Sequence, residues 1–328
     1  MREPLLPIAI DHAFQTGELS KEKASALLTS LIESSNDAQI RSQSIEILDK
    51  LGLIDSEIFK VLENSLVSDE NAIVRASALK QIILNFTNKS LALLEWVVDH
   101  DRSPIVLKVL YENVENSRDH RFKILKQKLA NWNMQFSEML CIVPKEVKFF
   151  LDLEALFAQN KRNYTIDPNS YKYFQQLSDT KDSEPWLLIR NKHVEILNFN
   201  YYNWNFVKQN QDIIDSFLKL GFLDVYLDSI NKYKVDGNLI QEIPESIGRF
   251  TYLKILILKG NKIIKIPESI GELTSLKELN LSHNKIQTIP LSIRSLENLE
   301  KLNLKHNNIL KIPDTLNSFL NSLKYFKY

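Results

Sequence analysis

The chain has 328 residues, and its 41 lysine and arginine residues equal its 41 aspartate and glutamate residues, so the formal net charge is zero. This balance excludes a protein that is basic over its whole surface and coats nucleic acid or anionic lipid. The single cysteine, Cys141, excludes an internal disulfide framework and a cysteine-based zinc site.

The chain begins with MREPLLPIAI, which is too short and too interrupted by proline to be a signal peptide. No later apolar stretch reaches the ~20 residues that a membrane-spanning helix needs. We therefore expect a cytoplasmic protein without a membrane span.

Residues 18–135 have the periodicity of amphipathic helices, with short polar breaks and no strand-like alternation. The segments AQIRSQSIEIL and AIVRASALKQI resemble each other at a distance of 34 residues, and SPIVLKVLYENV follows after a further 32. Each is preceded by another amphipathic helix, which predicts three helix pairs. The expected N-caps of the second helices are Asn36 or Asp37 and Asp69 or Asn71, and Pro104 suits a first helical turn.

Helix pairs that recur every 30–45 residues resemble HEAT or armadillo repeats. The aspartate and arginine of the second helix in that family match here at Asp37 and Arg41 and at Asp69 and Arg75, although the spacing differs. The third segment has Leu107 where the arginine would stand. The resemblance implies an all-α, HEAT-like domain over residues 1–135, and an irregular helical bundle is the alternative.

Residues 136–185 are helical at first and then strongly polar, so we expect a junction between two domains there. Cys141 lies in the apolar helical context EMLCIV and is expected to be a small buried residue rather than a nucleophile. The next segment, HVEILNFNYYNW, predicts a degenerate first strand through Val194, Leu197 and Phe199, after which the register stays open to residue 229.

The last hundred residues carry an internal repeat of 23 residues. Asparagine recurs at that period, and proline recurs six residues after each asparagine. The positions are Asn238, Asn261, Asn284 and Asn307, with Pro244, Pro267, Pro290 and Pro313. Leucines alternate before each asparagine, so they face one side of a short strand and form a core, while the asparagine amides are expected to form a ladder between turns.

These segments fit L-x-x-L-x-L-x-x-N-x-I-x-x-I-P-x-x-I/L-x-x-L/F and are identified as leucine-rich repeats, clearest over residues 230–328. The fold class implied for the whole chain is therefore two solenoids, the second an α/β domain over residues 186–328 with a parallel sheet of short strands. The I-P-x-x-I/L variety is similar to the Ras-group-related leucine-rich-repeat proteins, intracellular scaffolds of small-GTPase signalling. That resemblance implies protein binding without catalysis, with a small GTPase as partner by analogy alone.

The end of the sequence predicts one more strand, one residue out of phase, that starts near Leu323. Its aromatic residues, Tyr325, Phe326 and Tyr328, either lie back over the core or meet another chain, for example by self-association through the edge strand.

The sequence carries few residues in patterns typical of catalytic or metal-binding sites. The common nucleotide-binding, hydrolase and metalloprotease motifs are absent, so we expect no enzyme, no cofactor and no metal. His283 and His306 stand one repeat apart and are expected to stack about 5 Å apart without binding a metal. An unrecognised enzyme site around Tyr201, Tyr202 and Trp204, within residues 136–228, is the least favoured alternative.

The candidate site is therefore a surface. Side chains that alternate with the strand leucines point to the concave face of the repeats. We expect a partner protein to bind Ile255, Ile257, Lys259, Glu278, Asn280, Lys301, Asn303 and Lys305. From residue 229 onward, 15 lysine and arginine residues minus 9 aspartate and glutamate residues give +6. Nucleic-acid or anionic-membrane binding by this basic half is thus the alternative to protein binding.

Overall fold

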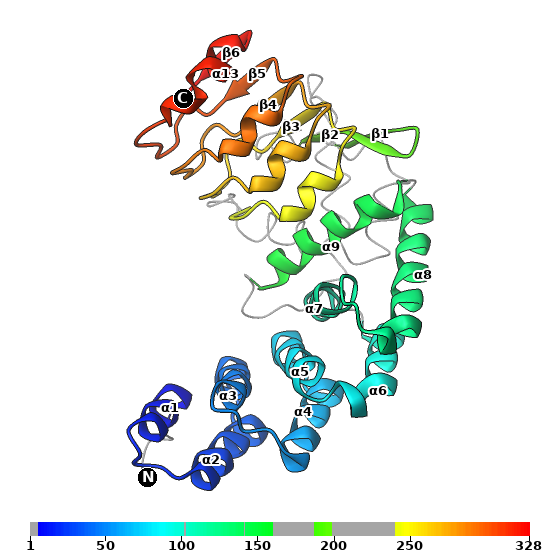
Figure 1. Cartoon of the computed structure of the whole chain (residues 1–328), viewed down its shortest axis with the longest axis vertical. Helices are drawn as coiled ribbons and strands as arrows, with labels where there is room; N and C mark the ends of the chain where they lie inside the picture. Colours follow the sequence, from blue (N-terminus) through cyan, green and yellow to red (C-terminus); the bar gives the residue numbers. More distant parts are fainter. Residues whose placement is uncertain (1–5, 102, 141, 160–186, 199–239) are drawn as a thin grey trace, which may run out of the picture. The chain divides into compact units, whose positions relative to one another are not determined.

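The computed structural model describes residues 6–101, 103–140, 142–159, 187–198 and 240–328 (Figure 1). They form two compact units that divide between Asn131 and Trp132. Several expectations lie outside the described residues: those for Cys141, Phe199, Tyr201, Tyr202 and Trp204, for the polar part of the junction, and for the repeat around Asn238. Within the described ranges, every helix is too short or too polar to cross a lipid bilayer.

The first unit is helical throughout its described part, as the periodicity predicted. Its elements are α1 (Pro7–Gln15), α2 (Lys21–Ser34), α3 (Ala38–Lys50), α4 (Ser56–Ser68), α5 (Ala72–Asn85), α6 (Thr87–His100), α7 (Pro104–Val114), η1 (His120–Phe122) and the start of α8 (Lys123–Leu140). Helix α2 packs on α3 and α4 packs on α5, while α3, α5 and α7 pack in series. Their buried residues include Ile45, Leu79 and Leu110.

At each of the two helices, one of the two candidate N-caps is confirmed. The carboxylate of Asp37 accepts the N–H of Gln39 at the start of α3, and the amide oxygen of Asn71 accepts the N–H of Ile73 at the start of α5. Asp69 instead follows the last turn of α4.

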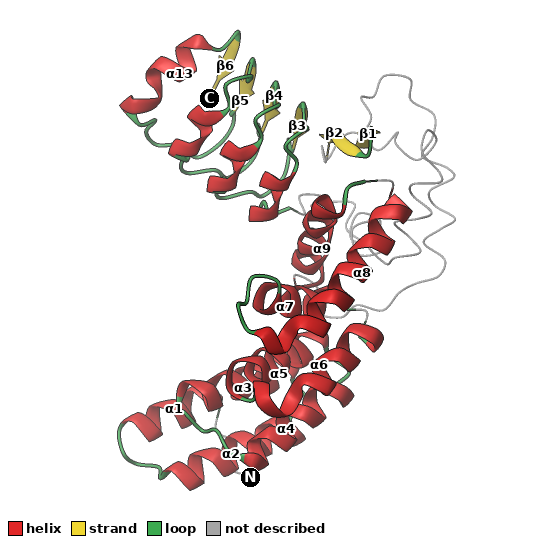
Figure 2. Cartoon of the chain, turned by 45° about the vertical axis from the view of Figure 1, so that its right-hand side comes forward, coloured by secondary structure: helices red, strands yellow, loops and turns green. Residues whose placement is uncertain are grey.

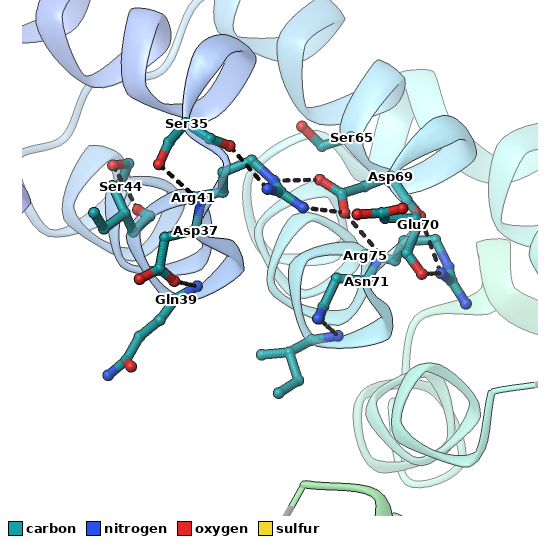
Figure 3. A network of polar contacts seen from close by, with 12 residues as sticks. Ser35, Asp37, Gln39, Arg41, Ser44, Ser65, Asp69, Glu70, Asn71 and Arg75 are labelled. Atoms are coloured by element: carbon teal, nitrogen blue, oxygen red, sulfur yellow. Dashed lines mark hydrogen bonds and ion pairs between the residues drawn. The ribbon is translucent and has the colours of Figure 1, made fainter. Parts of the chain in front are cut away.

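The arginines of α3 and α5 connect successive helix pairs (Figure 3). Arg41 donates from Nε and Nη2 to the carboxylate of Asp69, at 2.7 and 2.8 Å. Arg75 repeats the arrangement with Asp101, at 2.8 and 3.2 Å. The partner of each arginine is thus the aspartate that precedes the next second helix. Leu107, at the third arginine position, is buried, so the series of arginine–aspartate pairs ends at Arg75 and Asp101.

The second unit is built on a six-stranded sheet in the order β1-β2-β3-β4-β5-β6 (Figure 2). The strands are β1 (Leu187–Arg190), β2 (His193–Asn198), β3 (Ile255–Ile257), β4 (Glu278–Asn280), β5 (Lys301–Asn303) and β6 (Tyr325–Lys327). Strands β1 and β2 are antiparallel, and all other neighbours are parallel. The expected strand through Val194 and Leu197 is therefore present, and it lies directly beside β3.

The leucines share one register across the parallel strands. Leu197, Leu256, Leu279, Leu302 and Phe326 are paired in turn, and the four leucines are fully buried. Each proline is followed by a short helix on the opposite side: η4 (Glu245–Arg249), η5 (Glu268–Glu272), η6 (Leu291–Ser295) and η7 (Asp314–Leu316), which continues into α13 (Asn317–Ser322). This arrangement explains the 23-residue period, since each period is one strand, one turn and one return segment.

The expected asparagine ladder is present. The amide nitrogen of Asn284 donates to the carbonyls of Leu281, in its own repeat, and Leu258, in the preceding one, both at 2.9 Å. Its amide oxygen accepts the N–H of Ile263 at 3.1 Å. Asn307 makes the equivalent bonds one repeat later. Each asparagine therefore satisfies buried backbone groups of two turns.

The described part of the expected junction over residues 136–185 is helical, as its sequence predicted. Helix α9 (Pro144–Gln159) packs on η4 within the second unit, where the ring of Phe149 lies 4.9 Å from that of Phe250, centroid to centroid. The carboxylate of Asp152 accepts bonds from Lys148 Nζ at 2.6 Å and from Ser246 Oγ at 2.5 Å. Helix α9 thus buries part of the return segment that contains η4 and Phe250.

Strand β6 is one residue out of phase, as predicted, because Leu302 pairs with Phe326 after 24 residues. Only Phe326 takes the leucine position, and it is half-buried. Tyr325 and Tyr328 are exposed, so the expectation that all three aromatic residues cover the core is wrong for these two. Alternation puts Tyr325 on the outer side, whereas Tyr328 follows the last residue of β6 and is exposed there. Self-association through β6 stays a prediction.

Candidate interaction surface

The outward side chains of the parallel strands form two columns in register. One contains Ile255, Glu278, Lys301 and Tyr325, and the other contains Asn198, Ile257, Asn280, Asn303 and Lys327. Lys259, Ser282 and Lys305 follow one step later in the three repeats. The residues named from the sequence are therefore brought together on one face, at a strand spacing of about 4.8 Å.

Ile257 is the exception to the expected exposed surface, because only 6% of it is accessible. It lies between Asn198 and Asn280 at the same register, so in-register neighbours flank it on both sides. It belongs to the buried part of the sheet. Ile255, at the other end of the strand, is half-buried.

The polar residues of the face are partly engaged with one another. Lys301 Nζ lies 3.0 Å from Glu278 Oε2, in the next strand. The amide oxygen of Asn280 accepts both the N–H and the hydroxyl of Ser282, and that of Asn303 accepts the N–H of Lys305. These bonds fix the asparagine side chains at the end of each strand, so the face is ordered before any partner binds.

The two histidines stack as expected. The ring centroids of His283 and His306 lie 4.2 Å apart. Both residues have a positive φ, 57° and 58°, at the position where the preceding repeat has Gly260 with a φ of 79°. Burial lowers the pKa of His283, with smaller contributions from the neighbouring His306 and Lys259. Among the described residues, no three histidine, cysteine, aspartate or glutamate side chains are grouped to hold a metal ion.

A contact between a buried glutamate and a histidine was missed by sequence reasoning. Glu146, in the first turn of α9, is inaccessible, and its carboxylate contacts His193 Nδ1 and the N–H of Val194, both at 3.0 Å. Burial raises the pKa of Glu146, and the bonds from His193 and Val194 oppose that effect. The His193 ring stacks on Tyr252 at 3.9 Å. A lone glutamate at a helix start gives no sequence signal of a partner 47 residues away.

The comparisons with known proteins concern the repeats. Residues 233–286 and 251–309 match the family model described as Leucine rich repeat. Among solved structures, a leucine-rich-repeat protein of Leptospira interrogans is 38% identical over 26% of this chain and 22% of its own length, with a TM-score of 0.25. The comparison with curated proteins gave no match. The chain therefore contains leucine-rich repeats, a kind of domain that generally mediates protein–protein interaction.

Proposed function

We propose that the protein is a non-catalytic cytoplasmic adaptor that binds a partner protein on the concave strand face of its leucine-rich repeats. The observation that supports this most is the ordered face itself. Its side chains stand in register on strands that the asparagine ladder ties together. A preformed surface loses little conformational entropy when it binds, so more of the contact energy appears as affinity.

The residues proposed to contact the partner are those of the predicted surface that remain accessible. They are Ile255, Lys259, Glu278, Asn280, Lys301, Asn303 and Lys305. Ile257 is left out because its burial assigns it to stability.

The helical unit is proposed to act as a second, HEAT-like repeat surface. The recurrence of the Arg41–Asp69 and Arg75–Asp101 pairs between successive helix pairs supports a repeat architecture there. A small GTPase as the partner of the leucine-rich repeats rests on the resemblance of the I-P-x-x-I/L pattern to Ras-group-related repeats and on nothing else.

Site-specific photocrosslinking tests the proposed face. A benzophenone amino acid at Asn303, on the concave face, is compared with the same amino acid at Arg294, an exposed residue of η6 on the opposite side. We expect the Asn303 probe, in lysate of the source cells, to give discrete protein adducts that unlabelled wild-type protein competes away. Adducts of equal pattern from both positions, or none from Asn303, would contradict the proposal.

A further inference from the structure

The loops that follow strands β3, β4 and β5 are basic without exception. Residues 258–266, 281–289 and 304–312 together contain six lysines and two histidines, and they contain no aspartate or glutamate. The rest of the repeats mixes both signs of charge. The strand face and the segments before the strands hold paired charges such as Lys254–Glu195, Lys301–Glu278 and Lys324–Glu300.

These three loops lie side by side on one edge of the repeats. The N–H of Lys285 donates to the carbonyl of Ile263 at 2.8 Å. The N–H of Asn308 likewise donates to the carbonyl of Ile286 at 2.9 Å. Lys265 and Thr288 form a parallel bridge. Equivalent residues of successive loops are therefore spaced like neighbouring strands, about 4.8 Å apart.

We call five lysines of this edge the basic rim: Lys262, Lys265, Lys285, Lys305 and Lys311. Lys262 is half-exposed and the other four are exposed. Within the part of the chain that the structure describes, none of the five forms an ion pair with a carboxylate. The charges of these five lysines therefore face solvent and are not neutralised by carboxylates of the described residues.

Two apolar side chains are exposed among these lysines. Leu310 is 97% accessible and Ile264 is 50% accessible. They occupy the same position two repeats apart, with Gln287 between them, and the N–H of Gln287 donates to the carbonyl of Ile264. The edge therefore presents two exposed apolar residues on either side of Gln287, and each is followed in sequence by a lysine, Lys265 or Lys311.

The chemistry of this edge fits a lipid surface better than a protein or a nucleic acid. Protein interfaces are depleted in lysine and anchored by tyrosine, tryptophan and arginine, none of which occurs in these loops. Nucleic-acid surfaces use arginine for bidentate contacts and aromatic rings for base stacking. Anionic membranes attract clustered lysines and accept apolar side chains at the interface.

We propose that the basic rim docks on an anionic membrane surface, with Leu310 and Ile264 entering the interfacial layer. This activity differs from protein binding on the concave face, because the rim lies on the loops beyond the strands and shares only Lys305 with the proposed protein-binding residues. A protein docked by this edge leaves the centre of the strand face, at Glu278 and Asn280, open to a partner.

Vesicle co-sedimentation tests the proposal with the full chain. The probe is phosphatidylcholine vesicles with about one third phosphatidylserine, compared with pure phosphatidylcholine vesicles. We expect binding only to the anionic vesicles, weakened by added salt. The pair Lys285→Glu and Lys311→Glu is expected to lower the partition coefficient about ten-fold or more, and Leu310→Ser about three-fold.

The matched control is the pair Lys277→Glu and Arg294→Glu, which makes the same change in net charge at exposed residues outside the rim. We expect this pair to retain most of the binding, with unchanged circular dichroism in all variants. Equal losses in the two pairs would overturn the proposal. So would failure of the wild type to bind anionic vesicles, whether or not it binds polyglutamate or single-stranded DNA through the same lysines.

Discussion

The helical unit connects its successive helix pairs by different chemistry from that which connects the successive repeats of the repeat unit. In the helical unit, a charged side chain bonds to another charged side chain, as between Arg41 and Asp69. In the repeat unit, a neutral amide bonds to backbone groups of two turns, as Asn284 does. Helices satisfy their own backbone internally, so only side chains remain to link them. Strands of three residues leave buried N–H and carbonyl groups in the turns, and the asparagine is needed to pair them.

The largest effect is expected from Asn284→Ala. The carbonyls of Leu258 and Leu281 keep bonds from Asn261 and Asn307, but the N–H of Ile263 loses its partner in a buried turn. We expect a loss of about 3 kcal/mol from the free energy of unfolding of the repeat unit, because an unpaired buried group is added to lost hydrogen bonds. Urea unfolding combined with hydrogen exchange of residues 258–290 measures it.

The control for this variant is Asn308→Ala, at an exposed residue of the neighbouring repeat, for which we expect a change within about 0.5 kcal/mol. If the two variants lose similar free energies of unfolding, the buried amide of Asn284 stabilises the repeats no more than the exposed side chain of Asn308 does.

A smaller effect is expected from Asp69→Ala in the helical unit. Both side chains of the Arg41–Asp69 pair are about 10% exposed, so removal of the carboxylate leaves a largely buried guanidinium with one remaining bond, to the carbonyl of Ser35. We expect a loss of about 2 kcal/mol, seen as faster hydrogen exchange in α3 and α5.

The double variant Arg41→Met with Asp69→Ala is expected to recover part of that loss, since it removes the unpaired charge. Asp99→Ala, which breaks the more exposed Lys128–Asp99 pair, is expected to cost less than about 1 kcal/mol. If the double variant is less stable than Asp69→Ala, the cost arises from lost packing of Arg41 rather than from its charge.

The smallest effect is a pH dependence confined to the repeat unit. Because burial raises the pKa of Glu146 above its ordinary 4.5, the folded state holds a proton that the unfolded state has released. Stability should therefore fall as the pH rises from 4.5 through the raised pKa. Glu146→Gln should flatten that slope in urea titrations followed by exchange of β2 amides. If the wild type and Glu146→Gln show the same slope of stability against pH, the pH dependence arises from other titratable groups.

Much of the second unit follows from its sequence. The 23-residue period placed the buried leucines, the asparagine ladder, the parallel strands and the columns around Glu278, Asn280, Lys301 and Asn303, because each repeat meets only copies of itself. In the first unit, helical periodicity located the helices. It did not indicate that Arg41 pairs with Asp69, 28 residues away, rather than with the nearby Asp37.

Only the tertiary structure decided the contacts that break the repeat. It placed α9 against η4, with Phe149 beside Phe250. It buried Ile257 in a column that alternation assigns to solvent, and it joined Glu146 to His193. Periodicity fixes what a residue shares with its equivalents in other repeats, whereas burial and pairing depend on neighbours that the chain brings from elsewhere.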